Sequence, residues 1–350
     1  MKRIHAALGL LALVFAAGWA GHAAVSDGCM PEAGFSFICG PASVEDLVQI
    51  PGTHWIVGSG MSENRRPGML HLINAENKTW EILYPGANPK NEQDTQTFPS
   101  CAGAPDAGTF GAHGIAIRKD SNNISTLLAV NHGREAIEVF RLDAGRSKPV
   151  IRWVGCVPLD EHTSANSVAF LPGGGFVYTK FYDPKTGGFG AIMEHKITGG
   201  VFEWRPETGI RPIPGTELCG ANGIVVSRDG KRIYVAAWGT QELVQFSLLE
   251  SSPPAKKTVP TGFYPDNLRW APDGTILVAG QNQGPGGKGG FPSFKGWTVG
   301  KMDPVTMQIK EIAKDSGPLP MQNASVAVEV DGMLWIGPYL GDRIAYKPVK

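Results

Sequence analysis

A sequence unit that recurs six times along the chain limits most strongly what this chain can fold into. Each copy begins with a polar pair, continues into an apolar strand-like run, passes a turn and enters a second strand-like run. The turns, such as LPGGG, SRDGK and APDGT, are typical of hairpins because Pro presets φ and Gly or Asn tolerates positive φ. The six copies begin at Glu45, His113, Asn166, Asn222, Asp266 and Ala324.

The spacing of these copies predicts the fold class. Consecutive copies begin 44 to 68 residues apart, which leaves room for two further strands in each. Four strands at this period form a propeller blade. The 46 glycines, 27 prolines and 18% charged residues favour short strands and turns over helices. We therefore predict an all-β fold, a six-bladed β-propeller with four-stranded blades around a central metal-binding channel. A Rossmann-type sheet would need helices between strands, and a β-sandwich would leave the sixfold recurrence unexplained.

The N-terminus has the layout of a secretory signal peptide. Lys2 and Arg3 precede an apolar run over residues 6–20 and the small-x-small sequence Gly21-His22-Ala23. The run is short for a bilayer span, which needs about 20 residues, so a retained anchor is the weaker alternative. We predict a signal peptide over residues 1–23, a single propeller domain over residues 24–350, no transmembrane segment in the mature chain, and export to a periplasm or out of the cell.

Charge and cysteine content narrow the partners and the chemistry. The net charge is zero and the pI is about 7.1, which argues against nucleic acid or an anionic membrane as a partner. In an oxidising compartment, one or two disulfides are expected, and an odd count leaves one thiol unpaired. The spacing of the cysteines does not fit a zinc site. The five cysteines are Cys29, Cys39, Cys101, Cys156 and Cys219.

The polar residues that open the copies predict a cation site. In a propeller, the first residues of the innermost strands crowd towards one end of the channel. Two carboxylates and three amides suit calcium, which takes six to eight oxygens, better than zinc or magnesium. The alternative is that each residue caps a local turn, but two carboxylates buried without a cation would be costly. The predicted ligands are Glu45, Asn166, Asn222, Asp266 and Asn267.

Two histidines lie on one predicted hairpin. His113 opens the second copy and His132 closes its second strand, so the hairpin brings both rings to one rim of the channel. We predict that His113 takes a proton from water and that His132 tunes or relays it. His162 is a third candidate. The Gly-rich stretch 281–294 lacks a phosphate-loop ending and is predicted to form a loop over the channel.

Six segments of the chain carry a family resemblance. They are VEDLVQIPG, HGIAIRKD, LLAVNHGREAIEVFRL, ANGIVVSRDGKRIYVA, PDNLRWAPDGTILVAG and ASVAVEVDGMLWIG, within about residues 39–347. In these segments, the chain resembles the paraoxonase/arylesterase family, within a broader group that includes gluconolactonases, senescence-marker proteins and strictosidine synthases. The resemblance implies a catalytic calcium on the five predicted ligands and a histidine dyad at His113 and His132.

The resemblance also has departures. It implies a second, structural calcium at Asp46 and the Ile115 carbonyl, but Ser167 stands where the family has Asp, which weakens that site. No cysteine follows Cys219, so the family's bridge between the first and last strands cannot form, and ring closure must rest on strand pairing. Residues 179–181 replace a family Asn-Asp-His run, so the substrate choice of the family should not be transferred.

Three functional hypotheses follow. The first is calcium-dependent hydrolysis of a small-molecule lactone or aryl ester, in which the metal polarises the carbonyl and the dyad activates water. The second is a sugar lactonase of the gluconolactonase type that does not need the dyad. The third is a non-catalytic binding propeller that calcium stabilises. Activity on gluconolactone without His113 separates the first two, and calcium-dependent melting without turnover would indicate the third.

Overall fold

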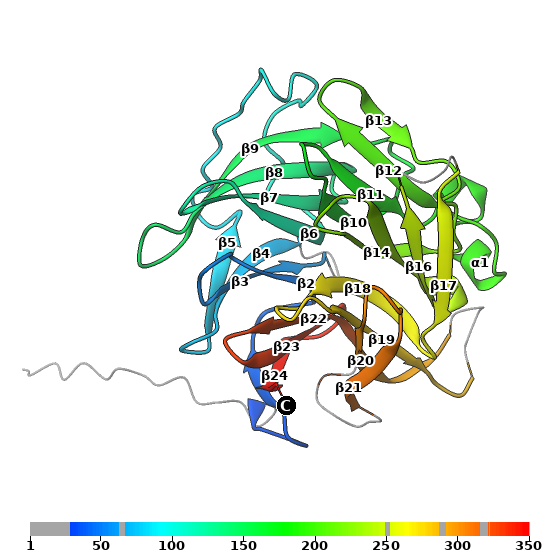
Figure 1. Cartoon of the computed structure of the whole chain (residues 1–350). Helices are drawn as coiled ribbons and strands as arrows, with labels where there is room; N and C mark the ends of the chain where they lie inside the picture. The colour runs from blue at the N-terminus through cyan, green and yellow to red at the C-terminus, as the bar shows by residue number, and fades with distance from the viewer. Residues whose placement is uncertain are drawn as a thin grey trace, which may run out of the picture.

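A ring of six radial sheets makes up the described part of the chain. The computed structural model describes residues 29–62, 67–248, 253–286, 292–315, 321 and 323–349. These residues form six four-stranded sheets, each antiparallel, arranged as blades around a centre (Figure 1). The predicted six-bladed propeller is confirmed. The predicted signal peptide and residues 287–291 of the predicted channel loop lie outside the described residues.

Blades 1 to 5 run outward in chain order from their innermost strands, and blade 6 ends on the N-terminal β1. Blade 1 contains β2 (Val44–Gln49), β3 (Trp55–Gly60), β4 (Met69–Asn74) and β5 (Thr79–Tyr84), and blade 2 contains β6 (Ala112–Lys119), β7 (Ile124–Asn131), β8 (Ala136–Asp143) and β9 (Val150–Pro158). Blade 3 contains β10 (Ala165–Phe170), β11 (Phe176–Lys180), β12 (Gly200–Arg205) and β13 (Gly209–Pro212), and blade 4 contains β14 (Ala221–Val226), β15 (Arg232–Ala237), β16 (Glu242–Ser247) and β17 (Ala255–Pro260). Blade 5 contains β18 (Tyr264–Trp270), β19 (Ile276–Gln283), β20 (Phe294–Met302) and β21 (Ile309–Asp315), and blade 6 contains β22 (Ala324–Val330), β23 (Met333–Pro338), β24 (Arg343–Pro348) and β1 (Ser36–Cys39).

Strand pairing closes the ring. The N-terminal β1 pairs with the C-terminal β24 and completes blade 6, where the blue and red strands lie side by side in Figure 1. The innermost strands β2, β6, β10, β14, β18 and β22 contact one another in sequence, and β22 contacts β2. A disulfide joins Cys29 to Cys39 beside β1, whereas Cys219 is buried as a free thiol. The expected closure without a bridge between the first and last strands is therefore confirmed.

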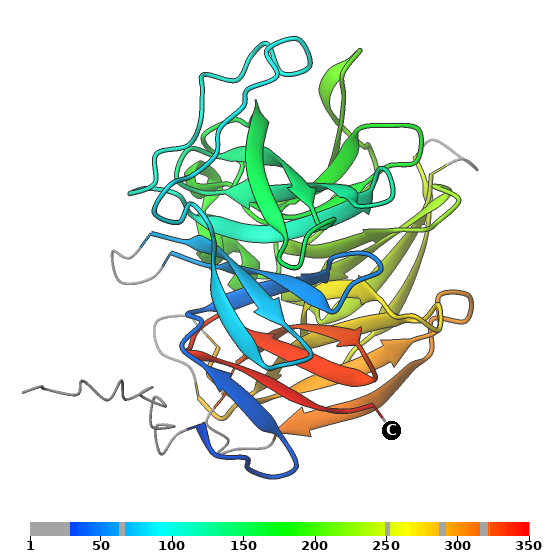
Figure 2. The ribbon, with the colours of Figure 1, turned by 90° about the vertical axis from the view of Figure 1, so that its left-hand side faces the viewer.

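Among the described residues, one α-helix and two 3-10 turns lie on the loops of blades 3 and 4. The six-residue helix α1 (Gly188–Met193) sits between β11 and β12, and short 3-10 turns occupy Pro184–Thr186 and Trp238–Thr240. Within the described ranges, no helix has the length and apolar character needed to cross a bilayer. The long connection over residues 85–111 runs along the outer strand of blade 2, where Asn91 bridges to Trp153 (Figure 2). A second disulfide, Cys101–Cys156, fastens this connection to β9.

A bulge at the start of every innermost strand turns polar residues towards the channel. The ladder between the first two strands of each blade shifts register near its start. The residues inside the shift leave the regular ladder, and bulges commonly re-aim side chains in this way. The shifts lie at Val44/Asp46, Ala112/Ile115, Ala165/Val168, Ala221/Ile224, Pro265/Leu268 and Ala324/Val326. The sixth channel position is thus Ser325, not Ala324 as the repeat alignment predicted, because Ala324 pairs normally with Pro338.

The blades approach one another at backbone distance around the channel. A Cβ at Gly114 would lie 2.3 Å from the Asn166 carbonyl oxygen, and one at Gly223 would lie 2.3 Å from that of Asp266. Only glycine fits such contacts. These two glycines therefore fix the spacing of adjacent blades at the level of the polar ring.

His71 in β4 is expected to make stability depend on pH. Its side chain is 1% exposed, and burial lowers its pKa to about 4 from 6.5, an effect that the Ala42 carbonyl only partly offsets. Between these pH values, the unfolded chain binds a proton that the folded chain does not. The contribution of His71 to the free energy of unfolding should therefore fall by about 3 kcal/mol as the pH falls from 6.5 to 4. Chemical denaturation of wild type and His71→Phe across this range measures the difference. His54→Phe, at a 40% exposed histidine of the same blade, should keep the wild-type slope; an unchanged slope in His71→Phe would contradict the assignment.

Candidate functional site

Five predicted ligands gather at one end of the channel. Glu45 lies in β2, Asn166 in β10, Asn222 in β14, and Asp266 with Asn267 in β18, so four blades contribute. Each side chain is at most 6% exposed. The Asn267 side-chain nitrogen donates to Glu45 Oε1 at 2.5 Å, which joins the ends of two non-neighbouring strands across the channel. The structure thus brings together all five residues that the repeat analysis selected.

The oxygens of this set are short of hydrogen-bond donors. Four buried atoms have no hydrogen-bond partner among the described residues, namely Glu45 Oε2, Asn166 Oδ1, Asn222 Oδ1 and Asn267 Oδ1. Buried polar atoms are ordinarily satisfied, because each orphan costs about 1–3 kcal/mol. Two carboxylates and three amides, all oxygen donors and several unsatisfied, fit a hard cation such as calcium. Over the ranges that the structure describes, no three His, Cys, Asp or Glu side chains gather as a metal group, and a cation bound here would use the amide oxygens as well.

Burial places both carboxyl groups under electrostatic strain. Desolvation raises the pKa of Glu45 to about 7, although the Asn267 amide and Arg269 oppose the shift. Desolvation, and then repulsion from Glu45, raises the pKa of Asp266 well above its ordinary value. Burial, which disfavours the charged form, is the larger cause for both groups, and for Asp266 the nearby Glu45 adds to it. A bound cation would relieve this repulsion and return both groups to the ionised form.

A second layer of side chains holds Asp266. The Gln281 side-chain nitrogen donates to Asp266 Oδ2 at 2.7 Å and to the Ala324 carbonyl at 2.9 Å, and Trp238 Nε1 donates to Gln281 Oε1 at 3.2 Å. Gln281 is 1% exposed. Sequence reasoning missed Gln281, since it lies at the far end of β19 and shares no position in the repeat with the ligands.

The two histidines meet as predicted, and a third residue extends the pair. His113 Nδ1 lies 2.7 Å from His132 Nε2, and His132 Nδ1 lies 2.5 Å from Glu135 Oε1. The Glu135 carboxylate accepts a hydrogen bond from His132 Nδ1–H, and in this tautomer His132 Nε2 accepts from His113 Nδ1. His113 Nε2 then carries the lone pair of its ring, and this atom lies 3.5 Å from Glu45 Oε1. Burial lowers the pKa of His113 to about 4, which keeps this ring neutral at pH 7.

The turn that carries His132 and Glu135 is rigidly supported. Glu135 has a φ of 41°, which is uncommon for a residue with a side chain. Asn131 Oδ1 accepts from the backbone of Gly111 and Gly133, while its amide nitrogen donates to the fully buried Glu138 at 2.7 Å. A strained backbone held by a satisfied buried network is typical of functional sites.

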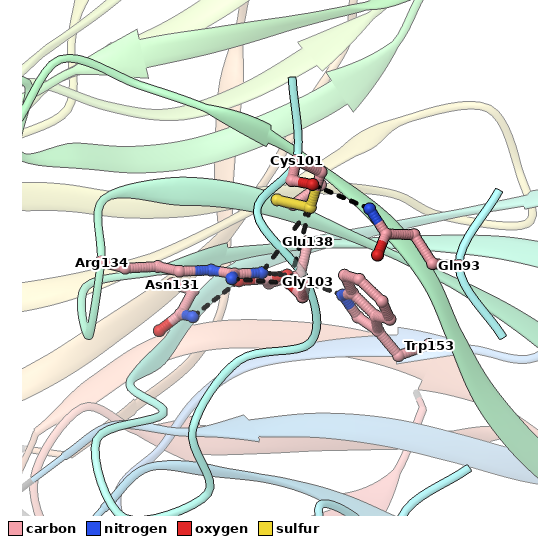
Figure 3. Close-up of a disulfide and its surroundings, with 8 residues drawn as sticks. Gln93, Cys101, Gly103, Asn131, Arg134, Glu138 and Trp153 are labelled. Atoms are coloured by element: carbon pink, nitrogen blue, oxygen red, sulfur yellow. Dashed lines mark hydrogen bonds and ion pairs between the residues drawn. A yellow bond between two sulfur atoms is a disulfide. The ribbon is translucent and has the colours of Figure 1, made fainter. Parts of the chain in front are cut away.

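Glu138 is the centre of that network, beneath the second disulfide. Figure 3 shows the Arg134 guanidinium and the Trp153 indole converging on its carboxylate. Arg134 Nη2 and Trp153 Nε1 each lie 2.7 Å from Glu138 Oε2, and Arg134 Nη1 donates to the Gly103 carbonyl. The disulfide of Cys101 therefore joins the connection over residues 85–111 to the hydrogen-bond network that positions His132.

A cavity opens above the ligands and the histidines. Its volume is about 600 Å³, and its floor includes Glu45, Asn166, Asn222 and Asp266. Six aromatic side chains contribute to its wall: Phe181, Tyr182, Phe189, Trp238, Phe294 and Tyr339. Of the described residues in the predicted channel loop, 281–294, Gln281 and Phe294 line the cavity. The cavity thus combines polar and charged groups with aromatic side chains.

Two other sequence candidates have different surroundings. His162 Nε2 lies 2.8 Å from Glu161, and His162 does not line the cavity, so the structure does not bring it to the dyad. At the altered run 179–181, Thr179 Oγ1 donates to the Asn222 carbonyl at 2.7 Å and accepts from Ser167 N. Thr179 thus links blades 3 and 4 behind the ligands, while Phe181 contributes to the wall.

The place predicted for a second metal holds a side chain instead. Arg269 Nη2 forms an ion pair with Asp46 Oδ2 and donates to the Ile115 carbonyl at 2.8 Å. Both predicted donors of the second site are therefore engaged by a guanidinium. The donor set does not fit a second cation, in contrast with the first site.

The fold and the channel site together define a class, the six-bladed propellers with an oxygen-lined central channel. The solved structures that resemble this chain share that fold. A luciferin-regenerating enzyme is 14% identical and covers 89% of this chain and 96% of its own, with a TM-score of 0.54. A structure described as a putative gluconolactonase is 15% identical and covers 92% and 94%, also with a TM-score of 0.54. At these identities, the likeness concerns the fold.

Within this class, the sequence resembles a human protein, serum paraoxonase/lactonase 3. The two are 26% identical over 197 residues, which is 55% of this chain and 52% of the human protein. The match thus spans about half the length of that relative. No family model matches the chain. The resemblance to the paraoxonases predicted from the sequence motifs is confirmed.

Proposed function

We propose that this chain is a calcium-dependent hydrolase of lactones or aryl esters. The observation that carries the proposal is the group of unsatisfied buried oxygens on Glu45, Asn166, Asn222 and Asn267, which lie beside Asp266 and within reach of the same cavity as the histidine pair. A binding module would have no need of a neutral histidine aimed at such a site. The resemblance to a human paraoxonase/lactonase supports the same reaction class.

The residues have distinct roles in this proposal. Glu45, Asn166, Asn222, Asp266 and Asn267 would hold the ion. Bound calcium would polarise the substrate carbonyl as a Lewis acid and stabilise the oxyanion. His113 Nε2 takes the proton of the attacking water, which adds roughly 10²–10⁴-fold. His132 accepts a hydrogen bond from His113. The Glu135 carboxylate, bonded to the other nitrogen of His132, stabilises the positive charge that develops on the two rings.

The wall of the cavity favours an apolar substrate. Six aromatic side chains line it, and Trp238 packs against Tyr264 and Phe294 within a continuous aromatic cluster. Such a lining suits an aryl group or a lactone with a hydrocarbon chain. Polar side chains such as Ser164, Glu135 and Gln281 also line the cavity, so the sugar-lactonase alternative is decided by the substrate panel. The two disulfides agree with export to an oxidising compartment.

The test is hydrolysis of a panel of γ- and δ-lactones and aryl esters by the purified mature chain. Each substrate is assayed with calcium, after chelation, and after calcium is restored. We expect turnover that chelation removes and calcium restores, with faster turnover of the apolar members than of gluconolactone. Calcium-dependent melting without turnover of any substrate would instead select the non-catalytic propeller.

Glu135 is expected to act as a positioning residue. In Glu135→Gln, the charge that favours the Nδ1–H tautomer of His132 is lost, so kcat should fall by about 10- to 100-fold with an unchanged KM. Glu135→Asp should restore part of the kcat, since a carboxylate remains. The control is Glu161→Gln, at an 82% exposed side chain outside the cavity. Equal kcat in Glu135→Gln and the control would contradict a relay through Glu135.

A further inference from the structure

Arg269 is the only charged residue at its position among the six innermost strands, which the structure describes in full. Counted from the bulges, the fourth residue of each innermost strand is equivalent in all six blades, and five of these residues are small and apolar. They are Val48, Ala116, Ala169, Val225 and Val328. In blade 5 the position holds Arg269, at 8% exposure. All six line a cavity of about 500 Å³ at the other end of the innermost strands from the calcium ligands.

The guanidinium extends from this cavity into the middle of the channel. Besides Asp46 and the Ile115 carbonyl, it contacts the Leu47 carbonyl through Nε and the Leu268 carbonyl through Nη1, each at 2.8 Å. These acceptors come from blades 1, 2 and 5. One fixed positive charge thus gathers a carboxylate and three carbonyl oxygens, which is the kind of oxygen set that a hard cation collects.

The residues around the Arg269 guanidinium also leave no place for a metal ion. Asp46 is fully buried, and its remaining lone pairs accept from the backbone of Leu47 and Ile115 at 2.8 Å. Ser167, the equivalent of Asp46 in blade 3, has a neutral hydroxyl that lies 3.4 Å from Ile224 N. A metal ion bound to Asp46 and the Ile115 carbonyl would lie next to the Arg269 guanidinium rather than next to a second carboxylate. Two positive charges in contact inside the protein repel strongly.

We propose that Arg269 serves as a built-in cation in place of a second structural metal, so that the oxygen set around Asp46 binds no calcium ion and the fold does not need one there. A guanidinium is always charged and satisfies planar oxygen acceptors through several N–H groups at once. It cannot be removed by chelation. The propeller should therefore stay folded when calcium is removed, and only the ion at the opposite end of the strands should exchange. This inference does not rest on the proposed activity.

The first test counts bound calcium per chain by elemental analysis after equilibration with calcium and removal of excess. One ion agrees with the proposal. A count of none also agrees with exclusion by Arg269, but it contradicts the calcium chemistry of the proposed function. Two ions, with one lost in Asp46→Asn, would overturn the proposal.

The second test converts the site. In Ser167→Asp/Arg269→Ser, the guanidinium is replaced by a small hydroxyl and a second carboxylate is added, so we expect one more calcium per chain than in wild type and a Tm that rises with calcium. Arg269→Met alone should lower the Tm by roughly 5–15 °C, because it leaves Asp46 buried without its partner. Arg118→Met, at a 44% exposed arginine, is the matched control. Wild type that unfolds on chelation, or Arg269→Met that melts like the control, would overturn the proposal.

Discussion

Replacing Asp266 with asparagine is expected to lower kcat/KM for a lactone by about 10³-fold and to abolish calcium binding. Asp266 is one of two carboxylates in the oxygen set, so its loss removes half of the charge that attracts the ion. A Lewis-acid metal contributes several kcal/mol to the transition state, and each 1.4 kcal/mol is a factor of ten in rate. Steady-state kinetics and calcium titration measure the two losses.

The stability of the Asp266→Asn variant separates loss of the ion from loss of the fold. In the absence of metal, the wild-type carboxyl is buried beside Glu45 and its pKa is raised by burial and by that neighbour. A neutral amide avoids this cost and still accepts the bond from Gln281. The metal-free variant should therefore melt at or above the metal-free wild type. Asp273→Asn, at a 51% exposed residue of the same hairpin, should leave both kinetics and calcium binding intact. Full activity in Asp266→Asn would contradict a metal at this position.

Replacing His113 with glutamine is expected to lower kcat by roughly 10²–10⁴-fold while calcium binding is retained, because in the proposed mechanism the ring acts as the base and not as a ligand. The loss in His132→Gln should be smaller than that in Asp266→Asn, since His132 acts through His113. Kinetics on one lactone and one aryl ester, together with calcium titration of each variant, give the order of effects.

The matched control for the dyad is His162→Gln, which alters a histidine outside the cavity. It should be kinetically silent. If His113→Gln keeps its activity on gluconolactone, the sugar-lactonase alternative gains support. If His132→Gln is more damaging than Asp266→Asn, chemistry centred on the metal is contradicted.

The fold was predictable because short sequence patterns within each repeat indicate its strands and turns. Hairpin turns such as LPGGG and APDGT mark the first two strands of a blade, and the period leaves room for two more. The polar opening residues were predictable for the same reason, since equivalent positions of a propeller share the channel. The error at blade 6 arose because the repeat alignment started this copy at Ala324, one residue before Ser325, and only the ladder register shows which of the two lies in the bulge.

The supporting residues were not predictable, because their partners are distant in sequence and absent from the repeat. Gln281 reaches Asp266 across a hairpin, and Arg269 reaches Asp46 across 223 positions of the chain. Glu135 is nearer, three residues after His132, but an acidic residue in a turn is usually solvated. Its role depends on a tight turn with φ of 41° that sequence patterns do not indicate.

The most direct measurement of the central claim is a crystal of the mature chain grown with calcium, examined for anomalous scattering in the channel. We expect one peak at about 2.3–2.6 Å from oxygens of Glu45, Asn166, Asn222, Asp266 and Asn267, beside the cavity that His113 lines. A channel without such a peak, in a protein that hydrolyses lactones in the same calcium solution, would contradict a calcium-centred site.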